Sequence, residues 1–174
     1  MEKSTWVQQT LVAYEGRLLR YAAKFVPEPA AREVVQEVFL RLWKQDPAEL
    51  EGKTAEWLFH VCRNLSLDVL KKEGKLVQMD TSEEAGLADG QRSAGEALEN
   101  AETDSDVQKL VALLPAVQAE VVRLKFQEGL SYKQISAITG HSVSHVGVLL
   151  HRAMLTLRAK LGASVSAKGG SHAG

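Results

Sequence analysis

Residues 129–153 read GLSYKQISAITGHSVSHVGVLLHRA, and this stretch decides the fold of the C-terminal part of the chain. Ser131 is followed three positions later by Gln134, which is the capping-box pattern at the start of a helix. Residues 140–142 then predict a tight turn. After this turn, one face of a second helix carries the apolar residues Val146, Leu150, Ala153 and Leu157. Two helices joined by so short a turn are typical of a helix-turn-helix.

The second helix of such a motif enters the DNA major groove, and the side chains opposite its buried face meet the bases. In this chain that opposite face carries Ser144, His145, Val148, His151 and Arg152. The whole chain has a net charge of -1, but residues 107–174 hold eight Lys and Arg against two Asp and Glu. We therefore predict DNA binding by this face. An ordinary helical hairpin has the same apolar spacing and is the alternative.

The sequence offers little support for other chemistry. His141 and His145 stand four residues apart, but no cysteine or carboxylate lies near enough in the sequence to complete a zinc site, so we expect no metal and no cofactor. No nucleophile-and-base pattern or phosphate-binding glycine loop is present, and we predict that the chain is not an enzyme. Cys62 is the only cysteine. It cannot form an internal disulfide, and we expect it to be a small buried residue.

Helical periodicity predicts an all-α protein of two small domains. The patterns upstream cover about residues 5–25, 29–44 and 54–72, with Pro29 suited to a first helical turn and Thr54 to an N-cap. The patterns downstream cover residues 107–114, 115–127, 131–139 and 144–161. We therefore predict domains at 1–75 and 107–163, followed by a disordered tail at 164–174.

Between the two predicted domains lies an acidic segment. Residues 76–106 hold nine Asp and Glu against one Arg, with few large apolar residues to order them, and so predict a flexible linker. An acidic helix at 93–101 is the alternative for part of this segment. No apolar run approaches the roughly 18 residues that a membrane span needs, so we expect no membrane insertion and a cytoplasmic location.

The helix predicted over 29–44 has an apolar stripe formed by Ala31, Val35, Val38, Phe39 and Leu42. The opposite side is polar except for Leu40. An apolar residue at the centre of a polar face suggests a protein-docking surface. Isolated exposed leucines are common in monomers, which is the alternative.

The helix predicted over 54–72 has an apolar stripe formed by Leu58, Val61, Cys62, Leu65 and Val69. This stripe leaves His60, Arg63, Asn64 and Lys71 pointing outward. Arg63, Lys71, Lys72 and Lys75 suit phosphates, and Trp57 or Phe59 suits stacking on exposed bases. A solvated basic helix end with core aromatics is the alternative.

Two groups of motifs resemble the extracytoplasmic-function group of the sigma-70 family of sigma factors. Residues 33–43, EVVQEVFLRLW, and residues 56–72, EWLFHVCRNLSLDVLKK, are similar to the N-terminal domain of that group. Leu114-Pro115, residues 128–140, EGLSYKQISAITG, and residues 151–153, HRA, look like its promoter-reading C-terminal domain. The order and spacing of the motifs match, and the resemblance covers about 120 of the 174 residues.

The resemblance implies a three-helix sigma domain 2 over 1–75, an acidic linker, and a helix-turn-helix sigma domain 4 over 107–163. Such a chain binds core RNA polymerase, directs it to promoter DNA, and is held inactive by an anti-sigma factor. The resemblance implies core binding by Glu33, Gln36, Glu37, Leu40 and Arg41. It implies that the loop 46–53 lies near the -10 element. The residues that it implies contact this element are Lys53, Trp57, His60, Arg63, Asn64, Lys71 and Lys72. It implies contact with the -35 element by Ser142, Ser144, His145, Val148, His151 and Arg152.

The chain departs from the family pattern at two places. Ala30 and Arg32 stand where the second-helix motif usually has acidic residues. Residues 147–149, GVL, replace the usual small polar and basic residues of the reading helix. Each absent base removes a phosphate contact, which predicts weak duplex affinity, while Val148 is suited to a thymine methyl group. The departures leave two alternatives open: a sigma-like protein that binds an anti-sigma factor, and a helix-turn-helix repressor.

Overall fold

A computed structural model of the chain describes the backbone of residues 2–74 and 105–172 and the side chains of residues 2–74 and 106–162. Within these ranges the chain forms helices and loops without a strand, which confirms the predicted all-α class. The predicted acidic linker lies outside the described residues, apart from Ser105 and Asp106, which begin a helix. The alternative acidic helix at 93–101 also lies outside them.

The described helices form two compact units. Unit 1 contains the three N-terminal helices and the segment Lys133–His141. Unit 2 contains the other described helices, apart from the one that lies mostly within Lys133–His141. This grouping differs from the predicted domain 107–163 in where it places residues 133–141. The predicted domain boundaries stay a prediction.

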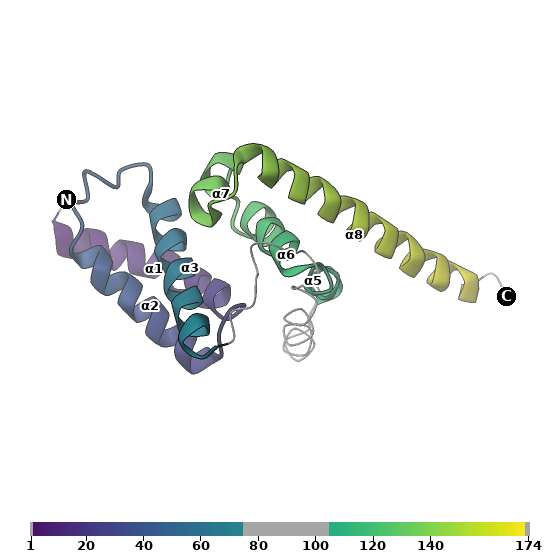
Figure 1. Cartoon of the computed structure of the whole chain (residues 1–174), viewed down its shortest axis with the longest axis horizontal. Coiled ribbons are helices and arrows are strands. Elements are labelled where there is room, and N and C mark those ends of the chain that lie inside the picture. Colours follow the sequence, from purple (N-terminus) through teal and green to yellow (C-terminus); the bar gives the residue numbers. More distant parts are fainter. Residues whose placement is uncertain (1, 75–104, 173–174) are drawn as a thin grey trace. The chain divides into compact units, whose positions relative to one another are not determined.

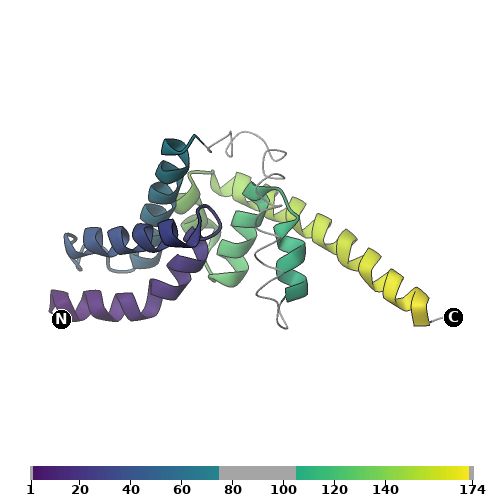
Figure 2. The same cartoon turned by 90° about the horizontal axis from the view of Figure 1, so that it is seen from below.

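Unit 1 is built on α1 (Lys3–Ala22), α2 (Glu28–Trp43) and α3 (Thr54–Lys72), and each of these helices packs against the other two (Figures 1 and 2). Pro29 lies in the first turn of α2, as predicted, where its missing amide hydrogen costs no helical hydrogen bond. The prediction that Thr54 caps α3 is wrong. Lys53 is the N-cap residue, and the Thr54 hydroxyl donates to the carbonyl oxygen of Leu50 at 3.1 Å.

The core of unit 1 combines aliphatic side chains with a small aromatic cluster. The predicted stripe of α2 is buried throughout, together with Val34. Tyr21 makes edge-to-face contacts with Phe25 and Phe59, with ring centroids 5.2 Å and 5.3 Å away. Burying a Leu or Phe side chain contributes about 1.5–3 kcal/mol. In the three helices α1 to α3, the large side chains with less than 2% exposure are Leu18, Val38, Leu42, Leu58 and Phe59.

Unit 2 contains α5 (Ser105–Ala112), α6 (Ala116–Val122), a π-helical turn (Arg123–Gln127) and α8 (Val143–His172). α6 packs against α5 and α8. The helix predicted over 115–127 is present as α6 followed without a break by the π-helical turn. At its end the amide of Glu128 donates to the carbonyl oxygen of Arg123 five residues earlier, at 3.0 Å. Gly129 ends this segment with φ of 71°, the left-handed conformation expected of a helix-stopping glycine.

A short turn connects α7 (Tyr132–Thr139) with α8. Gly140 adopts φ of 84°, which residues other than glycine rarely adopt. The hydroxyl of Ser142 accepts the amide N–H of His145 at 3.0 Å and so caps the first turn of α8. α8 runs on to His172 and includes residues 164–172, for which the sequence predicts disorder. No proline follows Pro115 to stop the helix.

Candidate protein-binding and nucleic-acid surfaces

The outward side of α2 brings together the residues predicted to bind core polymerase. Glu33, Gln36, Leu40 and Arg41 are exposed, and Glu37 is half-buried. Spacings of three and four residues place them on one face of the helix. Leu40 is 57% exposed, which makes it a large apolar side chain in contact with water at the centre of this face.

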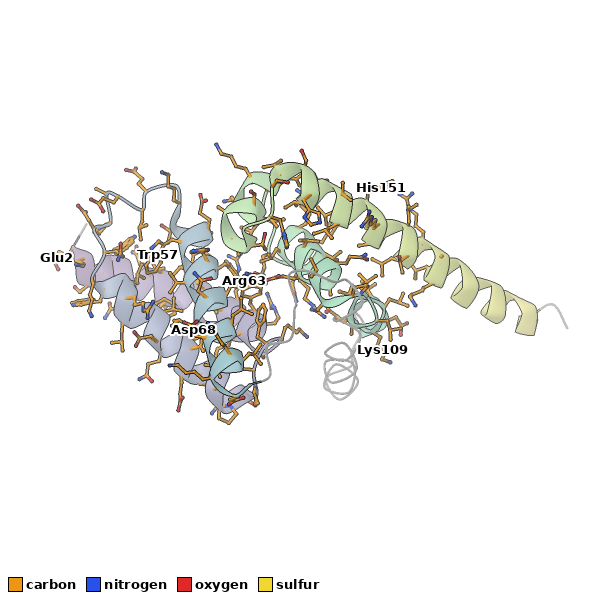
Figure 3. All side chains as sticks on the ribbon, in the orientation of Figure 1. Glu2, Trp57, Arg63, Asp68, Lys109 and His151 are labelled. Carbon is orange, nitrogen blue, oxygen red and sulfur yellow. The ribbon has the colours of Figure 1, made fainter. Side chains whose placement is uncertain are left out.

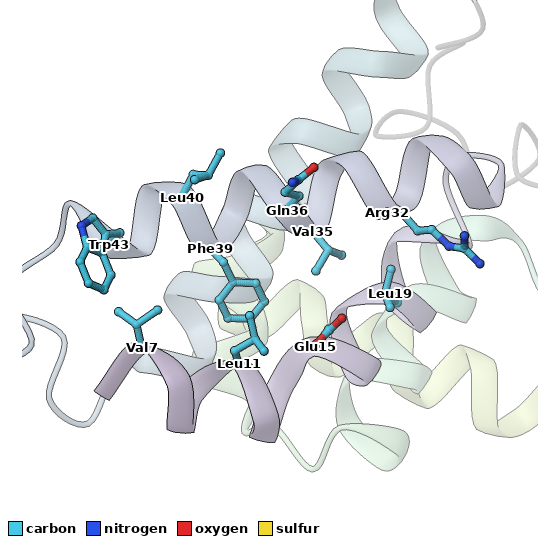
Figure 4. Close-up of a pocket in the computed structure, with 10 residues that line it drawn as sticks. All are labelled: Val7, Leu11, Glu15, Leu19, Arg32, Val35, Gln36, Phe39, Leu40 and Trp43. Atoms are coloured by element: carbon cyan, nitrogen blue, oxygen red, sulfur yellow. The ribbon is translucent and has the colours of Figure 1, made fainter. Parts of the chain in front are cut away.

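An apolar groove adjoins this face (Figure 4). It has a volume of about 590 Å³ and runs between α1 and α2. Gln36 and Leu40 belong both to the groove and to the predicted face, so the two surfaces are continuous. The other lining residues are Val7, Leu11, Glu15, Leu19, Arg32, Val35, Phe39 and Trp43.

The sequence analysis missed the contribution of α1 to this surface. Val7 and Leu11 are four residues apart and so share a helical face, but a pattern of this kind does not distinguish a core face from a groove. Trp43 was also missed, although it is 49% exposed at the end of α2. Arg32, which replaces an acidic residue of the family pattern, forms an ion pair with Glu28 one turn earlier.

The residues predicted to bind the -10 element lie along α3 and before it. Lys53, His60, Asn64, Lys71 and Lys72 are exposed, and Trp57 is half-buried. The side-chain nitrogen of Asn64 lies 3.1 Å from Nε2 of His60, one turn apart. Asp68 is also exposed and belongs to the same stretch of the helix (Figure 3), so the electrostatic field along α3 is less positive than its lysines alone suggest.

The prediction that Arg63 points outward is wrong, and Phe59 follows the alternative of a core aromatic. Arg63 is 5% exposed and Phe59 is fully buried, so neither is presented to DNA. The buried face of α3 is formed by Leu58, Phe59, Cys62, Arg63, Ser66 and Leu70. The predicted stripe was centred instead on Val61, Leu65 and Val69, which are only half-buried. The ring of Phe59 packs edge to face against Tyr21 in the core of unit 1, with centroids 5.3 Å apart.

Cys62 is buried and chemically protected, as expected. Burial raises the pKa of its thiol to about 12, and a hydrogen bond with Ser66 only partly opposes this effect. Its sulfur donates toward the carbonyl oxygen of Leu18 at 3.8 Å. The reactive thiolate is therefore scarce near neutral pH, and the residue serves packing.

The first turns of α8 present the side chains predicted to meet the -35 element. Ser142, Ser144, His145, Val148, His151 and Arg152 are exposed. The predicted apolar stripe of Val146, Leu150, Ala153 and Leu157 is buried, and so is Leu149. Ser142 differs from the others because its hydroxyl already caps the helix. Figure 3 marks His151 on the outer side of α8.

Unit 2 contains several buried polar side chains that the sequence patterns did not predict. Gln118 and Glu120 of α6 are 4% and 5% exposed, and Glu128 is 9% exposed. The Nε of Arg123 is buried without a hydrogen-bond partner. Burial lowers the pKa of Arg123 from 12.5 to about 10, and the charge of Glu120 partly opposes this effect.

The side chains that the structure describes contain no cluster of three or more His, Cys, Asp or Glu able to hold a metal ion. None of the described helices combines the length and the apolar character that crossing a membrane requires.

Comparison with known proteins matches both parts of the chain to family models. Residues 11–76 match sigma-70 region 2, and residues 105–157 match sigma-70 region 4. The chain is 28% identical to the ECF RNA polymerase sigma factor SigW of Bacillus subtilis, over 75% of each protein. It is 26% identical to the ECF RNA polymerase sigma factor SigE of Mycolicibacterium smegmatis, over 74% of this chain and 50% of that protein.

Proposed function

Since this chain belongs to the extracytoplasmic-function group of the sigma-70 family, we propose that it is an alternative sigma factor that directs core RNA polymerase to specific promoters. The observation that carries this proposal is the presence of region 2 and region 4, in that order, in one chain. The comparisons do not favour a helix-turn-helix repressor or a sigma-like protein that binds an anti-sigma factor, because the region 2 and region 4 models both match this chain.

We assign core binding to the exposed side of α2, with Leu40 at its centre and the α1–α2 groove beside it. An interface of this kind depends on a few well-packed apolar anchors, and the polar residues around them exclude water. Leu40 and Trp43 are the anchors that unit 1 offers on this side. Gln36, Glu37 and Arg41 would form the polar rim.

We assign contact with the -10 element to the exposed side of α3, which carries His60 and Asn64, with Lys53 just before the helix and Lys71 and Lys72 at its end. Half-buried Trp57 is the aromatic residue of this side that can stack on an unpaired base. We assign the -35 element to Ser144, His145, Val148, His151 and Arg152 of α8. The polymerase would carry out the phosphoryl transfer, and this chain would supply recognition and melting.

Joining the two recognition units in one chain compensates for weak binding by either alone. The second unit binds at an effective concentration near millimolar once the first is bound, if the span is reachable. A reading helix with few basic residues can therefore still contribute to promoter choice. We also propose that an anti-sigma factor covers these surfaces, and that the chain acts in the cytoplasm, where bacterial promoter DNA is found.

Run-off transcription tests the proposed function. Purified chain is added to core polymerase and fragmented genomic DNA from the source organism, and the transcripts are sequenced. We expect transcripts with shared 5′ ends that core polymerase alone does not produce. Failure to direct core polymerase to any promoter would overturn the proposal.

A further inference from the structure

The exposed side of α8 has an apolar side chain at its centre. Val148 is 44% exposed, while its neighbours Leu149 and Leu150 are buried at 1% and 4% exposure. Ser144 and His151 lie one turn before and after Val148, and both are exposed. Val148 therefore points away from the core of unit 2, in the middle of the surface assigned to DNA.

The chemistry around Val148 limits which bases this surface can recognise. Arg152 is the one arginine or lysine of the surface assigned to the -35 element, and residues 143–151 around Val148 contain neither of these side chains, which most often bind guanine through two hydrogen bonds. The hydroxyl of Ser142 is used to cap the helix. The side chain of Val148 has only methyl groups to offer. In the major groove, the one apolar group on a base edge is the C5 methyl of thymine.

A partly exposed aromatic ring lies beside this part of α8. A Cβ atom built on Gly147 would lie 3.6 Å from Cε2 of Tyr132, so the tyrosine ring rests beside the helix next to Val148. The ammonium group of Lys125 lies 5.4 Å from the centre of the same ring, which favours this ring position. Val146, Leu149 and Leu150 pack the other side of α8 into the core of unit 2. Val148 is thus presented from a supported helix, and a supported side chain discriminates between bases better than a mobile one.

We propose that Val148 selects a thymine in the -35 element through contact with its C5 methyl group. This inference rests on the proposed function, because it names the base that the same surface recognises. Recognition then depends on apolar contact at this position, and replacing thymine by deoxyuridine removes the contact without changing any hydrogen-bonding group. One buried methyl group corresponds to about a fourfold change in affinity.

The experiment uses the full chain bound to core polymerase and a promoter found by run-off transcription. Each thymine of the -35 element, on either strand, is replaced in turn by deoxyuridine, and the affinity of the holoenzyme is measured. We expect one replacement to weaken binding about fourfold. With Val148→Ala the affinity for thymine DNA should fall to a similar degree, and the replacement should have no further effect.

Leu155→Ala is the matched control, because Leu155 is 51% exposed on the same helix, two turns further on. This variant should keep the full methyl dependence. The inference is overturned if no thymine methyl matters, or if Val148→Ala retains the dependence while transcription from the promoter continues. A chain that uses no promoter at all overturns the proposed function as well, so the two failures are distinguishable.

Discussion

The Nε of Arg41 donates a hydrogen bond to Oε1 of Glu37 over 3.2 Å, one turn apart on the exposed side of α2. The two side chains are 49% and 45% exposed. An exposed pair at this spacing contributes only about 0.3–0.5 kcal/mol, because water screens it and ordering two long side chains costs entropy. Fold stability therefore does not depend on this pair, and both charges can be exchanged for those of a partner.

Leu40 lies next to this pair, and its truncation tests the assignment of the core-binding surface. We expect Leu40→Ala to weaken binding to core polymerase about tenfold, because the variant loses an apolar anchor. The free energy of unfolding should change by less than about 0.5 kcal/mol, since Leu40 is on the surface. Competition with labelled wild-type chain for core polymerase measures the affinity.

Val12→Ala is the control for this prediction. Val12 is 84% exposed on α1 and does not line the groove. Its replacement should leave core affinity unchanged. Equal affinity of the Leu40→Ala variant and the wild type would remove Leu40 from the interface.

Neighbouring residues on α3 separate a structural role from a role in DNA binding. Arg63 is buried and Asn64 is exposed. We expect Arg63→Ala to lower the free energy of unfolding by about 2 kcal/mol, because it removes a buried charged group with its interactions. Asn64→Ala should leave stability nearly unchanged and weaken opening of the -10 element. Trp6, Trp43 and Trp57 all belong to unit 1, so tryptophan fluorescence during denaturation reports its unfolding.

Opening of the -10 element is followed with permanganate, which reacts with unpaired thymines. A stable Arg63→Ala chain with defective opening would contradict the structural role given to Arg63. An Asn64→Ala chain that opens the promoter normally would remove Asn64 from the -10 surface.

Sequence patterns predicted the bounds of the helices of this protein more closely than the orientation of α3. The bounds of α3 and the buried stripes of α2 and α8 were predicted closely, because apolar periodicity is a local property. The orientation of α3 was not, since it depends on the fit of Phe59 against Tyr21, a contact between residues far apart in the chain. The groove between α1 and α2 depends on the packing of two helices, and the sequence of each alone does not contain it.

Two glycines near the helix-turn-helix should respond to alanine in opposite directions. Gly147 lies within α8, and a Cβ atom there would make an ordinary contact of 3.6 Å with Tyr132. We expect Gly147→Ala to stabilise unit 2 by up to about 1 kcal/mol through helix propensity. Gly140 has φ of 84°, so Gly140→Ala should destabilise the chain by about 1 kcal/mol. Thermal unfolding followed by circular dichroism measures both, and shifts of the same sign would contradict the conformations described.

Arg123 makes the stability of unit 2 depend on alkaline pH. Its folded pKa, about 10, is lower than its ordinary value of 12.5, because burial disfavours the charged form. The folded unit therefore binds this proton less tightly than the unfolded chain does. Below pH 10 the charge of Arg123 lowers the free energy of unfolding by its full amount. This destabilisation is relieved as the pH rises from 10 toward 12.5.

Arg123→Met together with Glu120→Gln keeps two long side chains and removes both buried charges, so we expect this double variant to stabilise unit 2 at pH 7 by about 1 kcal/mol. The stability difference between variant and wild type should shrink as the pH rises above 10, since wild-type Arg123 then loses its charge. Urea denaturation is followed by circular dichroism, and the unfolding transition that tryptophan fluorescence does not report belongs to unit 2. This transition measures the difference in stability. Arg158→Met, at an exposed position of α8, should show no such convergence. If the stability of the double variant runs parallel to that of the wild type through this range of pH, Arg123 keeps its proton there and its charge does not oppose folding.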